Sequence, residues 1–171
     1  MRKTLAIAIA AVLVLSVLLV GGQATPAQAD SPMLLKFSSM VGVPSGLTGA
    51  NSQSPLRGIN GGGIPWVLTS ANGFLKSNGD LKIEVEGLVL AAGANAGSNP
   101  ITSFRGLVSC VSNDGSFVNI LTDPFPATTG PALSGGGDAE IEATLALPHP
   151  CIAPIVFVTS PGGAWFAATG K

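Results

Sequence analysis

Four glutamates have the spacing that comes closest to a catalytic arrangement. Glu84 and Glu86 are two residues apart, as are Glu140 and Glu142, so each pair projects from one face of an extended strand. Side chains two apart on a strand lie about 7 Å from each other, and glycoside hydrolysis uses two carboxyl groups about 5 to 10 Å apart, one with a raised pKa. A hydrolase is therefore one hypothesis, and it is strongest if the two strands are neighbours.

The same glutamates also have a purely structural interpretation. Alternating glutamates on a half-buried strand ordinarily form its solvated face, which keeps sheets from pairing edge to edge. A Ca²⁺ ion held by these acids, or by Asp114 and Asp123, is a weaker alternative because no ligand spacing supports it. The sequence favours the solvated face, and we assign no catalytic residue and no metal ligand.

His149 is the only histidine, and it lies in a Pro-His-Pro-Cys segment. As a general base it would need a nucleophile such as Ser109 or Ser160. The sequence has no Gly-x-Ser-x-Gly motif that would raise a serine for attack, and one histidine with two cysteines cannot complete a common four-ligand zinc site. We therefore expect His149 to be an ordinary loop residue and predict no cofactor.

Two runs of three glycines, at 61–63 and 135–137, raise the question of a phosphate-binding loop. Neither run is followed by Lys-Ser or Lys-Thr, and neither precedes a helical pattern, so we interpret both as turns or loops. Arg57 lies just ahead of the first run. An arginine beside exposed amides could bind a carboxylate or a sulfated sugar.

Large aromatic side chains are the remaining candidates for recognition, since exposed rings stack on sugars and dominate many protein contacts. Adjacent strand residues point to opposite faces, so at most one of Trp165 and Phe166 should be in the core. Trp66 fits a core position better than a surface position, whereas Phe125, held between two prolines, should be exposed. The predicted binding surface consists of Phe125, Trp66, Trp165 and Arg57, although the absence of tyrosine argues against a dedicated sugar-binding site.

These candidates must be positioned by β-strands, because apolar residues recur with a period of two and no helical stripe follows residue 29. The dipeptides Asn72-Gly73, Asn78-Gly79 and Asp114-Gly115 supply the positive φ angles of tight turns. Strands are predicted near residues 34–41, 65–69, 73–77, 82–86, 104–111, 117–122, 138–147, 155–159 and 165–169. We predict an all-β single domain, residues 30–171: an antiparallel two-sheet β-sandwich of about eight short strands, Greek-key or jelly-roll-like.

Residues 1–29 have the pattern of a cleavable secretory signal peptide. Arg2 and Lys3 precede an uncharged apolar stretch, and Ala27 and Ala29 fit the small-residue cleavage pattern. A retained membrane anchor is the alternative, but the apolar stretch is short for a span of about 20 residues. We predict a secreted protein with no membrane span after cleavage.

Two cysteines, Cys110 and Cys151, remain in the exported chain, where they are expected to pair with each other. Closing a loop of roughly 40 residues stabilises a fold by about 4 kcal/mol in the chain-entropy model. The sequence therefore predicts one structural disulfide.

Several segments resemble a group of small secreted bacterial proteins with no established activity. They are Gly-Gly-Ile-Pro-Trp-Val at 62–67, Phe-Arg-Gly-Leu-Val-Ser-Cys at 104–110, and Pro-Cys-Ile-Ala-Pro-Ile-Val-Phe-Val at 150–158, followed by Ala-Trp-Phe-Ala at 164–167. The resemblance covers nearly the whole chain after the leader. It implies secretion from a bacterium and adds no function.

Net charge and amino-acid composition restrict the classes of molecule that this protein could bind. The chain has eight basic and nine acidic residues, and loss of Arg2 and Lys3 with the leader leaves six against nine, a formal charge of −3. The basic residues are scattered, so no nucleic-acid-binding surface is indicated. We predict a secreted or cell-surface, non-enzymatic protein that binds an extracellular polymer or another protein, or associates with itself. The alternatives are a hydrolase using the strand glutamates and a carrier with an apolar cavity of several hundred Å³ between the sheets.

Overall fold

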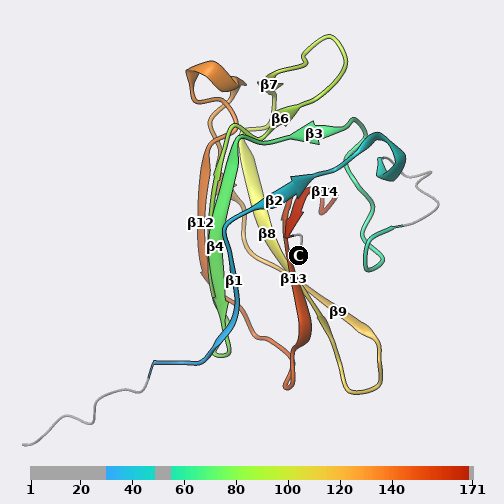
Figure 1. Ribbon diagram of the computed structural model, residues 1–171, viewed down its shortest axis with the longest axis vertical. Helices are drawn as coiled ribbons and strands as arrows, with labels where there is room; N and C mark the ends of the chain where they lie inside the picture. The colour runs from blue at the N-terminus through green and yellow to red at the C-terminus, as the bar shows by residue number, and fades with distance from the viewer. Residues whose placement is uncertain (1–29, 49–54, 170–171) are drawn as a thin grey trace, which may run out of the picture.

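Short antiparallel β-strands form nearly all of the regular structure (Figure 1). The computed structural model describes residues 30–48 and 55–169, so the predicted leader, residues 1–29, lies outside the described residues. The strands are β1 (Met33–Phe37), β2 (Met40–Gly42), β3 (Trp66–Val67), β4 (Ser70–Lys76), β5 (Asp80–Glu86), β6 (Val89–Leu90), β7 (Ser98–Asn99), β8 (Ser103–Val111), β9 (Phe117–Leu121), β10 (Phe125–Pro126), β11 (Gly130–Pro131), β12 (Ala139–Thr144), β13 (Ile152–Thr159) and β14 (Trp165–Thr169). Two short 3-10 helices, η1 (Ser45–Leu47) and η2 (Ala132–Ser134), lie between strands.

The all-β prediction is confirmed, but the predicted number of strands was too low. Fourteen strands are present among the described residues. Five of them, β3, β6, β7, β10 and β11, are only two residues long. A two-residue strand contains no repeat of the period-two pattern, so it cannot be recognised from periodicity.

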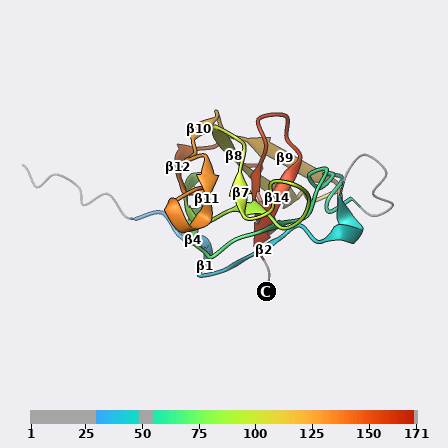
Figure 2. The same cartoon turned by 90° about the horizontal axis from the view of Figure 1, so that it is seen from above.

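The longer strands form two sheets that pack face to face (Figures 1 and 2). The four-stranded sheet has the order β1-β4-β5-β12, and the six-stranded sheet has the order β10-β8-β13-β14-β2, with β9 also paired to β8. One hydrophobic core fills the space between them. Its fully buried members include Leu75, Ile83, Val85 and Ile141 from the four-stranded sheet and Phe104, Val108, Val156 and Val158 from the six-stranded sheet. The predicted two-sheet β-sandwich is therefore confirmed.

The chain crosses between the sheets at both sides of the sandwich. On one side, β1 of the four-stranded sheet continues almost directly into β2 of the six-stranded sheet. On the other side, β10 pairs with β8, and the backbone N–H of Thr128 donates to the carbonyl of Asp138, just before β12, at 2.9 Å. These crossings cover part of the sheet edges, which would otherwise be open to pairing with other chains.

Two of the three predicted turns are confirmed. Gly79 has a φ of 92° between β4 and β5, and Gly115 has a φ of 83° between β8 and β9. The turn predicted at Asn72-Gly73 is wrong, because both residues lie inside β4. Glycine is needed at 73 for another reason: a Cβ there would lie 2.1 Å from the carbonyl oxygen of Lys82 on β5.

A disulfide joins Cys110 to Cys151, as predicted. Cys110 is buried on β8, and Cys151 directly precedes β13. The two cysteines are 41 residues apart in sequence, a separation for which the chain-entropy model gives about 4 kcal/mol of stabilisation. The bond therefore fixes the start of β13 against β8, its neighbour in the six-stranded sheet.

Candidate functional site

Two residues of the predicted binding surface, Trp66 and Trp165, are part of the core. Only 4% of Trp66 and 3% of Trp165 is exposed. The Trp66 ring stacks on Phe166 with the centroids 4.0 Å apart, and Trp165 meets Phe157 edge to face with the centroids 6.0 Å apart. The core position favoured for Trp66 is confirmed. Neither tryptophan presents its ring face at the surface.

The expectation that at most one of Trp165 and Phe166 is buried was wrong, because Phe166 is only 4% exposed. A register shift between Val158 and Thr159 of β13 leaves Phe166 as the extra residue of a β-bulge on β14. A bulge changes the direction of neighbouring side chains and so breaks strict alternation. In addition, β14 is buried on both faces, and backbone hydrogen bonds join Trp165 to residues 60–62.

Phe125 is also less available than predicted. It is half-buried and packs against the core, and β10 places it opposite Phe104 of β8. The two flanking prolines do not prevent this pairing, since β10 lies at the end of the sheet order, where a missing N–H is tolerated. The prediction of an exposed loop aromatic was therefore wrong.

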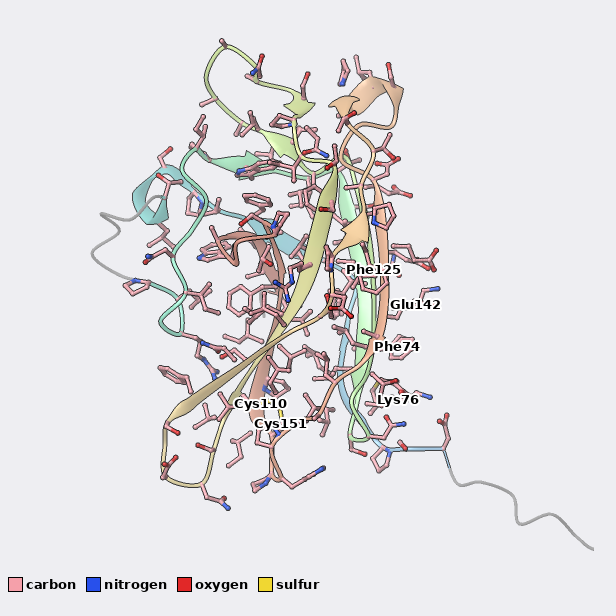
Figure 3. The ribbon with its side chains drawn as sticks, turned by 180° about the vertical axis from the view of Figure 1, so that it is seen from behind. Phe74, Lys76, Cys110, Phe125, Glu142 and Cys151 are labelled. Atoms are coloured by element: carbon pink, nitrogen blue, oxygen red, sulfur yellow. A yellow bond between two sulfur atoms is a disulfide. The ribbon has the colours of Figure 1, made fainter. Side chains whose placement is uncertain are left out.

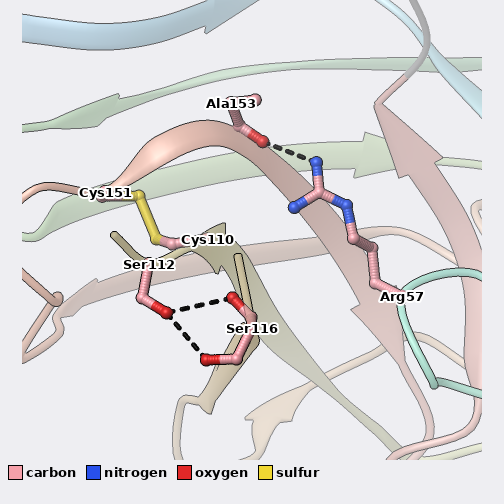
Figure 4. The surroundings of a disulfide bond; sticks show 6 residues. All are labelled: Arg57, Cys110, Ser112, Ser116, Cys151 and Ala153. Carbon is pink, nitrogen blue, oxygen red and sulfur yellow. Dashed lines mark hydrogen bonds between the residues drawn. A yellow bond between two sulfur atoms is a disulfide. The ribbon is translucent and has the colours of Figure 1, made fainter. Parts of the chain in front are cut away.

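Arg57 is half-buried and makes several contacts within the protein (Figure 4), although its Nη1 is buried without a hydrogen-bond partner among the described residues. Its Nη2 donates to the carbonyl of Ala153 at 2.8 Å, and its guanidinium carbon lies 4.9 Å from the centroid of the Phe117 ring. The carbonyl of Arg57 accepts a hydrogen bond from Nδ2 of Asn119 at 3.1 Å. Arg57 thus fastens residues 55–60 onto β9 and β13. The four residues of the predicted surface do not form one exposed patch.

The strand glutamates, in contrast, do come together. Strands β5 and β12 are neighbours, and Glu140 is directly opposite Glu84. The Nζ of Lys82 lies 2.7 Å from Glu140, 2.9 Å from Glu142 and 3.0 Å from Glu84. Glu86 lies at the end of β5, where it accepts a hydrogen bond from a serine of β4. Sequence spacing therefore placed the acids on one face, but it did not identify Lys82 as their shared partner.

Electrostatics in this cluster favour the ionised forms. Hydrogen bonds to Glu140, Glu142 and Glu84 raise the pKa of Lys82. The hydrogen bond from Lys82, helped by Asn72, lowers the pKa of Glu84. A glycosidase acid needs the opposite, a pKa raised by apolar surroundings, and these three carboxylates are largely exposed to solvent. The arrangement matches a solvated, ion-paired strand face.

A groove with a volume of about 440 Å³ lies beside this cluster. Three of its residues, Phe74, Lys76 and Glu142, project from the outer face of the four-stranded sheet (Figure 3). Phe74, which is half-buried, forms its apolar part, and the Nζ of Lys76 lies 5.7 Å from the centroid of the Phe74 ring. Lys82, Asp80 and Glu142 line the same groove. One surface thus combines an aromatic ring with ammonium and carboxylate groups.

The charged side chains of the groove are held in place by hydrogen bonds. Asp80 accepts hydrogen bonds from Asn78 at 2.8 Å and from Thr144 at 2.9 Å, and both lower its pKa. Lys76 donates to Asp30 at 2.6 Å, which raises the pKa of Lys76. These groups are therefore ordered before any ligand arrives.

Sequence reasoning missed Phe74. On β4, Ala71 and Leu75 are buried, whereas Asn72, Phe74 and Lys76 alternate with them and face outward. An aromatic residue on the polar face of a strand is a signal of recognition that the sequence contained. The mistaken turn at Asn72-Gly73 concealed it, because the turn divided the alternating pattern.

Other chemistry has little support in the described residues. The Ser109 hydroxyl is buried without a hydrogen-bond partner, so it is not paired with His149, which is exposed. No group of three or more His, Cys, Asp or Glu side chains in residues 30–48 and 55–169 is placed to hold a metal ion. The same residues include no helix with the length and hydropathy needed to cross a membrane.

Comparisons of the chain with protein-family models, curated proteins and solved structures found no match.

Proposed function

We propose that this protein is a secreted, non-enzymatic binding protein whose ligand is an extracellular polymer of sugar rings. The observation that carries the proposal is the groove around Phe74, in which an aromatic ring lies among Lys76, Lys82, Asp80 and Glu142. An aromatic ring can stack on the apolar face of a sugar. Ammonium and carboxylate groups nearby can donate and accept hydrogen bonds to its hydroxyl groups.

Two features of the sheet face suit an extended ligand. The groove is formed by three adjacent strands, β4, β5 and β12, so it lies on a surface supported by backbone hydrogen bonds. Its charged groups are already ion-paired or hydrogen-bonded, which reduces the side-chain entropy lost when a ligand binds. Mixed charge in the groove favours a neutral or zwitterionic polymer over a strongly charged one.

The two alternative hypotheses have less support. A hydrolase would need at least one glutamate with a raised pKa, and Lys82 acts on Glu84 in the opposite direction. A carrier would need an apolar cavity between the sheets. The groove at Phe74 opens on the outer face instead, and a Cβ at Gly106, which faces the core, would lie only 3.1 Å from Leu81.

The test is binding of the exported protein to polysaccharides before and after Phe74→Ala. Soluble oligosaccharides are titrated in thermal melts and by calorimetry, and insoluble cell-wall polysaccharide is used for co-sedimentation. A ligand specific to the native state raises the apparent stability. Loss of an anchoring aromatic should weaken binding by about tenfold or more.

Phe117→Ala is the matched control, because Phe117 is 53% exposed and lies on β9 of the other sheet. Binding should be unchanged in this variant. If the wild-type protein binds no polysaccharide in the panel, or if both variants lose binding equally, the proposal is wrong. Melting of each variant without ligand verifies that it is folded.

A further inference from the structure

Three uncharged stretches of the sequence meet at one end of the sandwich. Residues 58–75, 87–104 and 124–137 contain no Asp, Glu, Lys, Arg or His. Parts of these stretches meet: the N–H of Ala91 donates to the carbonyl of Pro65 at 2.8 Å, and that of Ala132 donates to the carbonyl of Gly97 at 3.0 Å. Figure 1 shows β3, β6, β7 and η2 together at the top of the view. We call residues 61–67, 88–99 and 127–137 the neutral end.

The neutral end exposes apolar side chains that do not serve the core. Leu133, on η2, has a relative exposure of 102%, so it is completely open to solvent, and η2 buries no residue at all. Ile64 is 40% exposed. Beside them, residues 91–97 form an exposed loop of the sequence Ala-Ala-Gly-Ala-Asn-Ala-Gly. A projecting leucine therefore lies next to a loop of small side chains.

The backbone that presents Leu133 is firmly held. Gly135 ends η2 in the left-handed conformation and donates to the carbonyl of Ala132 at 3.0 Å. A Cβ at Gly136 would lie 1.9 Å from the carbonyl oxygen of Gly130, so the loop is closely packed on itself. The buried side-chain amide of Asn99 donates to the carbonyl of Thr128 at 2.9 Å. An apolar anchor on an ordered loop loses little entropy when it docks.

We propose that the neutral end is a self-association surface, on which two copies of this chain form a two-fold dimer. A two-fold contact must be complementary to itself. Because Leu133 and the loop 91–97 are neighbours in one copy, a two-fold axis between them sets each leucine against the small-residue loop of the other copy. This interaction is separate from the proposed ligand groove, which is on β4, β5 and β12.

Charge favours a second copy at this end over contacts elsewhere. After loss of the leader the chain has nine acidic and six basic side chains, a formal charge of −3. Two copies meeting through the outer face of the four-stranded sheet would bring like-charged carboxylates together. The residues of the neutral end carry no charge themselves, and Asp138 borders them at Gly135, so the repulsion there is weaker. The neutral end also has no Lys or Arg for the headgroups of an anionic membrane.

The experiment is sedimentation equilibrium of the exported protein over concentrations up to about 1 mM, which detects a dimer whose dissociation constant is about 1 mM or lower. We expect a monomer–dimer equilibrium that added salt leaves unchanged or strengthens, because salt screens the repulsion between negatively charged copies. Leu133→Glu should weaken dimerisation by about tenfold or more. Ala94→Glu, in the facing loop, should also weaken it.

Ile152→Glu is the matched control, since Ile152 is 45% exposed and begins β13 next to the disulfide, away from the neutral end. It should dimerise like the wild-type protein. The proposal is wrong if the wild-type protein stays monomeric. It is also wrong if Ile152→Glu weakens dimerisation as much as Leu133→Glu does, or if Ala94→Glu has no effect on dimerisation. Leu133-dependent co-sedimentation of monomeric protein with phosphatidylcholine vesicles would also overturn it and would assign the surface to lipid.

Discussion

The two sheets of this sandwich differ in how many of their faces are buried. In the four-stranded sheet, β5 alternates between buried residues that face the core and more exposed residues that face solvent. In the six-stranded sheet, β8 has five consecutive buried residues from Gly106 to Cys110, and β13 ends with four. A strand with one buried face has a readable period of two, whereas a strand buried on both faces has none.

The second face of the six-stranded sheet is buried because another segment lies on it. Ile59 is buried, and the segment around it runs alongside Trp165. The N–H of Trp165 donates to the carbonyl of Asn60, and the N–H of Gly62 donates to the carbonyl of Trp165. Arg57 fastens the start of this segment to Ala153. Within residues 30–48 and 55–169, no comparable segment covers the groove at Phe74 on the four-stranded sheet. The difference between the sheets thus comes from a connection more than 40 residues away in sequence from β8.

Among variants that test this difference between the two sheets, Phe157→Ala should cause the largest loss of stability. Phe157 lies on β13 between Val156 and Val158, whose side chains point into the core, so the Phe157 side chain points to the opposite face of the sheet. Simple alternation would place that face in solvent, yet Phe157 is fully buried and contacts Trp165. Deleting a buried aromatic ring costs about 3 to 5 kcal/mol of unfolding free energy. Urea unfolding at neutral pH measures it.

Glu140→Ala is the corresponding change on the outer face of the four-stranded sheet. Glu140 is exposed, so stability should change little. If Phe157→Ala lowered the free energy of unfolding by less than about 1 kcal/mol, the second face of the six-stranded sheet would not be part of the core. The two sheets would then not differ in the number of their buried faces.

A smaller effect is expected from Lys82→Met, which removes the shared cation from Glu84, Glu140 and Glu142. In the wild-type protein the pKa of Glu84 is lowered, so its contribution to stability is present above its ordinary pKa of 4.5 and is lost as pH falls through the folded-state value. The variant should therefore be less stable than wild type at neutral pH, and the difference should shrink below about pH 4.

Urea unfolding at several pH values measures this difference. Lys36→Met is the control, because Lys36 is exposed on the same sheet but forms no ion pair with the described residues. A Lys82→Met deficit that persists unchanged at low pH would show that the lysine stem, and not its charge, stabilises the sheet face.

The smallest effect concerns the β8–β9 turn of the six-stranded sheet. A hydrogen bond from Ser112 at 2.6 Å, with others from Ser116, lowers the pKa of Asp114 to about 2. Its contribution to stability is present above the ordinary pKa of 3.8 and is lost as pH falls through about 2. An NMR titration should show this low pKa, and Ser112→Ala should raise it. An unchanged pKa in that variant would assign the shift to the backbone of the turn.

The sequence by itself determined the features that depend on local pattern or on counting. Glutamates alternating with apolar residues predicted β5 and β12 correctly, since those strands bury one face only. Asn78-Gly79 predicted the turn between β4 and β5 because positive φ is a property of the residue itself. Two cysteines in one chain left a single pairing, and the disulfide confirms it.

Only the tertiary structure decided which aromatic residues are exposed. Trp165 and Phe166 are both buried because a bulge redirects one of them and β14 is covered on both faces. Phe125 packs against the core and pairs with β8, while Phe74, which is also half-buried, lines the groove beside Lys82 on the outer face. Burial of a strand face depends on which segment, distant in sequence, packs on that face. The periodicity of apolar residues along a strand indicates only whether its two faces differ in polarity. For the same reason, the groove at Phe74 and the exposed Leu133 became visible only once the sheets and loops were in place.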